Sequence, residues 1–155
     1  MGALRDPQAL SSADDLAGYF VEDLTVGQAA SYAKTVTEAD IVLFAGVSGD
    51  TNPVHLNQEF AAKTMFKGRI AHGMLSAGFI STVLGTKLPG PGAIYMSQSL
   101  KFKAPVRAGD TVVARATVTA IVPDKRRVTL ATTCRVGDTV VIEGEAVVMV
   151  PSRAG

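Results

Sequence analysis

The sequence predicts an α+β fold in which an antiparallel β-sheet wraps around one long central helix. Helix caps and turn residues follow one another up to about residue 92, whereas apolar and polar residues alternate from there to residue 150. Between these parts, residues 72–84 are apolar on nearly all sides, which is typical of a buried helix. An antiparallel sheet has to cover its apolar face, and this helix is the available partner.

The N-terminal third is expected to contain a leader, a strand and a first helix. Residues 1–17 are polar, acidic and aperiodic, and we expect them to form a flexible leader. A short strand is predicted from Ala29 to Thr35. Thr37 is a helix N-cap candidate, because two acidic residues follow it in the first turn, where the helix dipole favours negative charge. This helix is expected to end at Gly49 and to bury Ile41, Phe44 and Ala45.

The middle of the chain is predicted to hold a turn, a second short helix and the central helix. The segment from Gly49 to His55 is interpreted as a turn, since Pro53 fixes its own backbone and disfavours a helical conformation at the preceding residue. The second helix is expected over residues 57–65, ending before the Lys-Gly pair at 67–68. The central helix is expected over residues 72–84.

Four strands are predicted in the remainder of the chain. They span residues 93–103, 112–122, 127–136 and 139–150. Gly-Asp and Pro-Asp pairs mark the turns between them. The full order is a strand, two short helices, a buried helix and four antiparallel strands. This order corresponds to the hot-dog arrangement, in which a sheet wraps around a helix.

Composition limits the classes of function. The chain has 155 residues, 47% of them hydrophobic, and a formal net charge of +1, so charge offers no argument for nucleic acid or an anionic membrane. No apolar run approaches the ~18 residues of a membrane span. Charged residues near the N-terminus interrupt any signal-peptide pattern, and the cytoplasm is the expected compartment. Cys134 is the single cysteine, and its alternating surroundings favour a buried core thiol.

One short turn has the residues that proton transfer requires. Asp50 and His55 bracket Asn52 within six residues, and the chain has only two histidines. Histidine exchanges protons near neutral pH, a carboxylate beside it can polarise a water, and Asn52 can orient that water without a change of charge. The same composition also suits an ordinary turn, in which Asp50 bonds to its own backbone. For Asp50 alone, the interpretation as an ordinary turn is favoured. When Asp50 is taken together with His55 and with the second candidate, described next, the functional interpretation is favoured.

The start of the predicted central helix is a second candidate. Gly73 stands where backbone amides are unpaired and the helix dipole favours negative charge, and glycine allows a carbonyl to approach closely. This arrangement suits an oxyanion hole, although tight helix–sheet packing explains the glycine equally well. Ser81 lies about two turns further on, where it could also bond back to a helix carbonyl. His72 is interpreted as structural, capping the helix or bonding across the turn.

Other motifs are weak or absent from the sequence. Gly90-Pro91-Gly92 lacks the third glycine and the context of a dinucleotide fingerprint. There is no Walker motif, zinc spacing or Gly-x-Ser-x-Gly elbow. Asp50, His55 and His72 fit none of the standard metal-ligand spacings, and no metal site is predicted.

The motifs around the two candidates resemble those of the MaoC-like hot-dog proteins, specifically the (R)-specific enoyl-CoA hydratases of the hydratase 2 type. The similarity covers residues 18–151, which we expect to form one MaoC-like domain between the leader and a tail, 152–155. The matching segments are Ser48-Gly49-Asp50, Asn52-Pro53-Val54-His55 with Ala61, Ala71-His72-Gly73-Met74, residues 97–106 and residues 144–146.

The resemblance implies reversible syn hydration of trans-2-enoyl-CoA to (R)-3-hydroxyacyl-CoA, without a metal or redox cofactor. Asp50 and His55 are then the catalytic pair, and Asn52 helps to place the water. The Gly73 amide binds the thioester oxygen, and Ser81 supports the pair from the central helix. It also implies an acyl-CoA substrate and a homodimer, and an unpaired sheet edge gains from such pairing.

Three alternatives share this fold: a 3-hydroxyacyl-ACP dehydratase, an acyl-CoA thioesterase and a non-catalytic acyl-CoA-binding module. The Asp50–His55 pair argues against the binding module, and the complete Asp-x-Asn-Pro-x-His set argues against the thioesterase. Candidate contacts of the CoA phosphates are Lys63, Lys67 and Arg69, although a solvated basic surface explains them equally well. The acyl pocket is expected to draw its walls from residues 57–70, Leu75 and Phe79.

Overall fold

The computed structural model describes residues 16–155 and contains a five-stranded antiparallel sheet packed on one helix. The strands are β1 (Ala29–Thr35), β2 (Ile94–Phe102), β3 (Thr111–Val122), β4 (Arg127–Val136) and β5 (Thr139–Met149). Their order in the sheet is β1-β3-β4-β5-β2, so β1 and β2 form the two edges. The predicted α+β hot-dog architecture is therefore confirmed. Residues 1–15 of the predicted leader lie outside the described residues.

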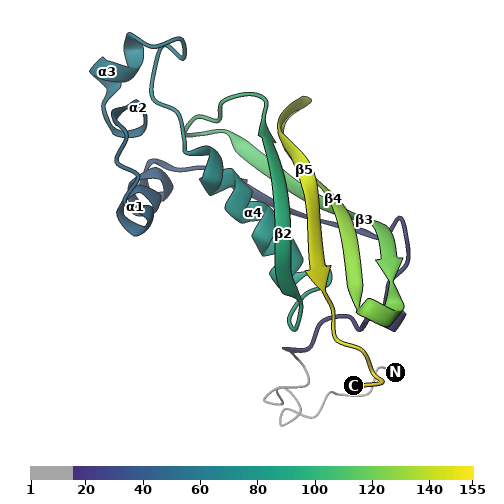
Figure 1. Cartoon of the computed structure of the whole chain (residues 1–155). Helices are drawn as coiled ribbons and strands as arrows, with labels where there is room; N and C mark the ends of the chain where they lie inside the picture. Colours follow the sequence, from purple (N-terminus) through teal and green to yellow (C-terminus); the bar gives the residue numbers. More distant parts are fainter. Residues whose placement is uncertain (1–15) are drawn as a thin grey trace, which may run out of the picture.

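The helices are α1 (Glu38–Ser48), α2 (Pro53–Leu56), α3 (Gln58–Ala62) and α4 (Gly73–Thr86). In Figure 1, α4 lies across the sheet, while α1, α2 and α3 stand beyond one end of it. We call residues 38–72, which contain these three helices and the turns after them, the helical segment 38–72. Short 3₁₀ turns at Val21–Asp23 and Pro123–Lys125 complete the secondary structure of the described part.

The caps of α1 agree with the sequence prediction. The Thr37 side chain accepts a hydrogen bond from the Asp40 amide, and the Asp40 side chain accepts one from the Thr37 amide in return. Gly49 ends the helix in the left-handed conformation, with φ of 77°, which glycine adopts without strain. Ile41 and Ala45 are buried as expected, whereas Phe44 is only half-buried.

Two details of the helical segment 38–72 differ from the prediction. Part of the predicted turn is helical, because Asn52 caps a single turn, α2, that begins with a proline at its first position. The helix predicted to reach residue 65 ends at Ala62, and the Thr64 hydroxyl donates to the carbonyl of Ala61 just beyond it. His55 therefore sits on a helical turn, which fixes its direction more tightly than a loop.

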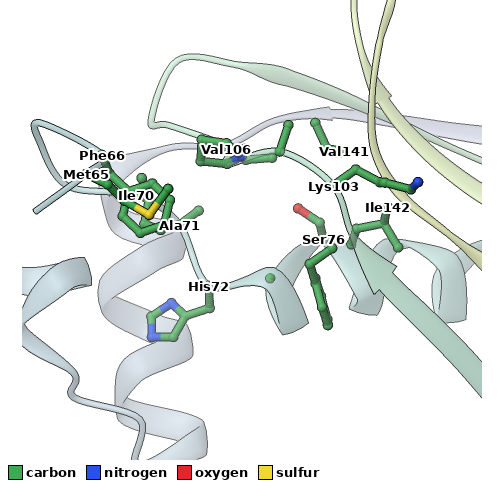
Figure 2. Close-up of a pocket in the computed structure, with 14 residues that line it drawn as sticks. Met65, Phe66, Ile70, Ala71, His72, Ser76, Lys103, Val106, Val141 and Ile142 are labelled. Carbon is green, nitrogen blue, oxygen red and sulfur yellow. The ribbon is translucent and has the colours of Figure 1, made fainter.

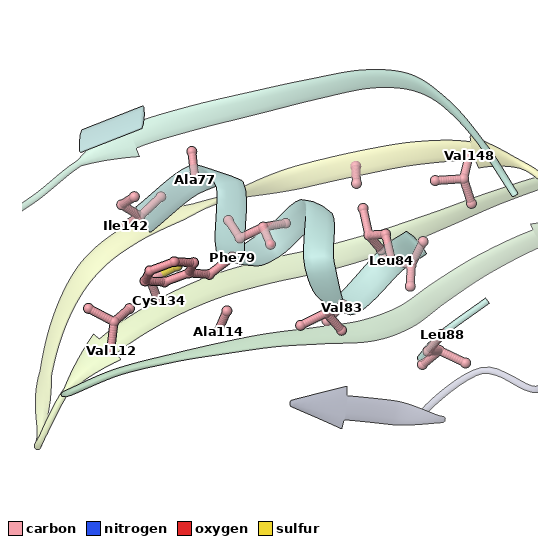
Figure 3. Packing of buried hydrophobic residues seen from close by; sticks show 14 of the residues in the cluster. Ala77, Phe79, Val83, Leu84, Leu88, Val112, Ala114, Cys134, Ile142 and Val148 are labelled. Atoms are coloured by element: carbon pink, nitrogen blue, oxygen red, sulfur yellow. The ribbon is translucent and has the colours of Figure 1, made fainter. Parts of the chain in front are cut away.

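The core lies between α4 and the strands β1, β3, β4 and β5. Figure 3 shows Phe79, Val83 and Leu84 projecting from α4 toward the sheet. Small residues on the strands, such as Ala114 and Ala146, are fully buried and allow the helix to approach closely. The opposite side of α4 remains exposed in the single chain, along Met74, Gly78, Ser81 and Gly85.

Cys134 belongs to this core, as predicted. Its side chain is fully buried on β4, and the thiol contacts the carbonyl of Ser76 at 3.5 Å. Burial in apolar surroundings raises the pKa of the Cys134 thiol to about 12. The thiolate is thus unavailable at neutral pH, and the residue acts as a small apolar side chain.

No helix among residues 16–155 is long and apolar enough to cross a membrane.

Candidate active site

The turn between α1 and α2 places the Asp50 carboxylate at the surface. The Asp50 amide donates to the Ser48 hydroxyl at 3.1 Å, and Asp50 Oδ1 accepts from the Asn52 amide at 3.3 Å. Asn52 Oδ1 in turn accepts from the Val54 amide at 3.1 Å, which caps α2. The oxygen of Asn52 is thus occupied by the cap, and its NH₂ group is the part left to position a water.

His55 is 7% exposed, and both its ring and its backbone carbonyl take part in hydrogen bonds. Its Nδ1 lies 2.8 Å from the carbonyl oxygen of Ile70. A carbonyl can only accept, so we assign the proton to Nδ1, which leaves the lone pair of Nε2 available to receive a proton. The His55 carbonyl accepts from Arg69 Nε at 2.7 Å, and Arg69 is also paired with Glu38 at 2.7 Å.

Asp50, His55 and Gly73 meet at one cavity of about 190 Å³. Gly73 is the first residue of α4, and no side chain caps the helix at this end, so its amide is open to a ligand. The ring of Phe102, from the end of β2, lies directly against Gly73: a Cβ added there would stand 2.6 Å from two ring atoms. Glycine is therefore required for this close approach.

Such an arrangement can perform acid–base chemistry on an electrophilic carbonyl compound. The carboxylate and the Nε2 lone pair can bind and polarise a water, and the helix amide can stabilise negative charge on a carbonyl oxygen. The sequence predicted the convergence of the turn with the helix start, and the structure brings them together. His55 and Gly73 are 18 positions apart in the sequence, and no local pattern encodes their contact.

A metal site is less compatible with the same geometry. Potential donor atoms of Asp50, His55 and His72 lie within 4.8 Å of one another. However, the two imidazole rings are stacked, with centroids 3.7 Å apart and planes inclined by 26°. Lone pairs of stacked rings run nearly parallel, whereas tetrahedral coordination requires them to converge on the ion.

Ser81 does not join the pair within one chain. It lies on the exposed side of α4 and lines a separate cavity of about 410 Å³ between α4 and β2. The walls of that cavity include Met74, Tyr95 and Met96.

A third cavity, of about 390 Å³, is also lined by Gly73 and is shown in Figure 2. Its walls are mostly apolar and come from residues 65–66, residues 70–73, Ser76, residues 102–106, Val141 and Ile142. Of residues 57–70, only Met65, Phe66 and Ile70 line this cavity. Phe79, also predicted as a wall, is buried in the core and packs edge-on against Tyr32 at 5.7 Å. Leu75 likewise packs against the core.

The candidate contacts for CoA phosphates separate into two kinds. Lys63 and Lys67 are exposed at the end of the helical segment 38–72, where they can reach an anionic ligand. Arg69 is instead engaged with the His55 carbonyl and with Glu38. In the described structure Arg69 thus connects the His55 backbone to the start of α1.

His72 is the site residue that sequence reasoning underestimated. Its Nε2 lies 2.9 Å from the carbonyl oxygen of Asp50, and its ring is stacked on that of His55. The predicted bond across the turn is present, whereas the side chain makes no helix cap. The signal available in the sequence was the position of His72 directly before Gly73.

Comparison with known proteins identifies the family. The profile of the MaoC like domain matches residues 23–143. The chain belongs to this family. This MaoC-like chain is 68% identical over 142 residues to the (R)-specific enoyl-CoA hydratase of Rhodospirillum rubrum, an alignment that covers 92% of this chain and 99% of the relative.

Two further comparisons agree on the family and the fold. The MaoC-like chain is 53% identical over 134 residues to the 3-hydroxybutyryl-CoA dehydratase of Methylorubrum extorquens, covering 86% of this chain and 85% of the relative. Its structure is similar to the unliganded R-hydratase PhaJ1 of Pseudomonas aeruginosa, with a TM-score of 0.82 and 46% identity over 88% of each chain.

Proposed function

We propose that the protein is an (R)-specific enoyl-CoA hydratase, which reversibly adds water to trans-2-enoyl-CoA and yields (R)-3-hydroxyacyl-CoA. The observation that carries this proposal is the meeting of Asp50, His55 and the Gly73 amide at one cavity. The 68% identity to a hydratase over nearly the whole chain supports the same reaction.

Each part of the site has a place in the reaction. The Gly73 amide donates to the thioester oxygen, so that C3 of the enoyl group becomes electrophilic and the enolate charge is stabilised, an effect worth ~10²–10³ in rate. Water held by Asp50 and His55 bonds to C3 through its oxygen and transfers a proton to the pair. The pair returns a proton to C2 on the same face and ends in its starting state. Asn52 orients the water through its NH₂ group.

The active form is a homodimer. The edge strand β2 exposes Ile94, Tyr95 and Met96, and α4 exposes Met74 beside it. Pairing of two such edges covers these apolar residues and removes an unpaired strand edge. It also offers the one route by which Ser81 can approach the catalytic pair. Light scattering coupled to size-exclusion chromatography tests this: a protein that remains monomeric at assay concentration contradicts it.

The alternatives are separated by one set of assays. Loss of the conjugated enoyl absorbance with crotonyl-CoA and longer enoyl-CoA substrates is expected, with a product of R configuration. A 3-hydroxyacyl-ACP dehydratase requires the carrier protein for turnover, and a thioesterase releases free thiol without hydration. A binding module turns over neither substrate. The cytoplasm stays a prediction from the sequence.

Two substitutions test the residues. Asp50→Asn and His55→Gln keep the size of each side chain, and both are expected to reduce kcat by at least ~10² while the fold persists. Circular dichroism and thermal melting report the fold. Near-full activity in either variant refutes the assigned pair.

A further inference from the structure

His72 contacts Asp50 and His55 and directly precedes Gly73 in the proposed site. It is 2% exposed and lies directly before Gly73 at the start of α4. Its ring stands between those of Phe44, at 4.8 Å, and His55, at 3.7 Å. A ring packed between two others cannot rotate freely, so a shift of His72 also displaces the rings of Phe44 and His55.

A single hydrogen bond sets the orientation of this ring. A backbone carbonyl can only accept, so His72 carries its proton on Nε2 and donates it to Asp50 at 2.9 Å. Nδ1 of His72 is buried and has no partner among residues 16–155. Turning the ring over therefore breaks its one bond, and the bond ties the Asp50 backbone to the start of α4.

Stacking of the His72 ring on the His55 ring fixes the plane of His55, the proposed base. His55 can rotate about its Cβ–Cγ bond, and that rotation determines where the Nε2 lone pair points. The Nδ1–H bond to Ile70 restrains one edge of the ring, and the face of His72 restrains its plane. Both restraints act on the His55 ring, and His72 also lines the cavity at which Asp50, His55 and Gly73 meet.

We propose that His72 is a positioning residue that holds Asp50, His55 and the Gly73 amide in the relative positions that hydration requires. This inference rests on the proposed hydratase function. A displacement of about 1 Å between reacting groups costs on the order of 10²-fold in rate. Loss of the His72 bond is therefore expected to reduce kcat by about 10–100-fold, whereas KM stays near the wild-type value.

The test compares two replacements of His72 with a matched control. His72→Phe keeps a ring between Phe44 and His55 but removes the donor to Asp50. His72→Gln places an amide nitrogen near the position of Nε2, so it keeps the donor and loses the stack. The control is Thr86→Ala, at the far end of the same helix, where the hydroxyl donates only to the helix carbonyl of Thr82 in the described chain. Hydration of crotonyl-CoA and thermal melting are measured for each.

Expected results are a folded His72→Phe protein with reduced kcat, partial recovery in His72→Gln, and wild-type kcat in the control. Wild-type kcat in folded His72→Phe overturns the inference, as does equal kcat in the two His72 variants. If His72→Phe does not fold, His72→Gln against the control decides. A wild-type protein that does not hydrate enoyl-CoA refutes the proposed function itself, which is a separate outcome.

A spectroscopic measurement is independent of turnover. Because the untagged chain has only two histidines, both rings can be resolved in ¹H–¹⁵N spectra that report imidazole tautomers. The wild-type protein is expected to show one ring protonated at Nε2, His72, and one at Nδ1, His55. In His72→Gln, which loses the stack, the His55 ring is expected to become a mixture of tautomers. A pure Nδ1–H form in that variant contradicts the positioning role.

Discussion

Replacing Gly73 by alanine tests the electrostatic half of the site with little change elsewhere. The added Cβ stands 2.6 Å from two carbon atoms of the Phe102 ring, whereas carbon atoms in contact prefer about 3.5–4.0 Å. The ring or the helix start must therefore move by about 1 Å. Phe102 is 55% exposed, so the ring has room to swing outward.

The stability of the Gly73→Ala protein should remain close to that of the wild type. Alanine gains about 0.5–1 kcal/mol over glycine in a helix, while overpacking costs about 1–3 kcal/mol. The free energy of unfolding therefore falls by no more than about 2.5 kcal/mol. In contrast, kcat/KM is expected to fall about 10²-fold, because the Gly73 amide no longer lies at the right distance from the water held by Asp50 and His55.

The assay is the initial rate of enoyl chromophore loss, with thermal melting as the measure of fold. A double variant, Gly73→Ala with Phe102→Ala, removes the clash and is expected to recover most of the lost activity. Phe102→Ala alone serves as the control, with a smaller loss. Wild-type kcat/KM in Gly73→Ala refutes the argument that the close approach at the helix start is needed for catalysis.

Two further predictions concern the core and the first helix. Because burial raises the pKa of Cys134 to about 12, a thiol reagent should label the native protein slowly and the urea-unfolded protein at once; rapid native labelling contradicts the burial. The ammonium group of Lys34, bonded to Asp40 at 2.6 Å, and the Thr37 amide lower the pKa of Asp40. A lowered folded pKa stabilises the fold above the ordinary carboxylate range, ~4, and this contribution is lost as the pH falls further. Asp40→Asn should therefore lower Tm at neutral pH, and the difference from wild type should shrink in acid; a difference independent of pH contradicts it.

Local signals explain which elements could be predicted from the sequence. The limits of α1 followed from Thr37 and Gly49, since caps act within a few residues of a helix end. The strands followed from alternation. The turn at α2 was missed although Asn52 and Pro53 form an N-cap followed by a proline, a pattern that also suits a turn.

The rest depended on tertiary contacts. The sequence singled out Asp50, His55 and Gly73, but it could not show that Phe102 covers the glycine from another strand. The bond from His72 to Asp50 spans 22 residues and has no periodic signature. Ser81 was assigned a role beside the pair, yet helix geometry turns it toward the β2 side of α4. Arg69 was considered for phosphate, and its neighbours, Glu38 and the His55 carbonyl, became known only from the fold.

The separation of the helical segment 38–72 from the sheet has a consequence for heat tolerance. Asp50, Asn52 and His55 all belong to this segment, which Figure 1 places beyond the end of the sheet. Regions with few buried contacts open at a lower free energy than the global unfolding of a core. On heating, we therefore expect activity to be lost before the sheet melts, and we expect stabilisation of the core alone to leave the working temperature unchanged. Substitutions meant to raise the temperature at which the enzyme stays active should therefore strengthen the helical segment 38–72. The hydrogen bonds of Arg69 and Arg107 to backbone carbonyls of this segment are the place to begin.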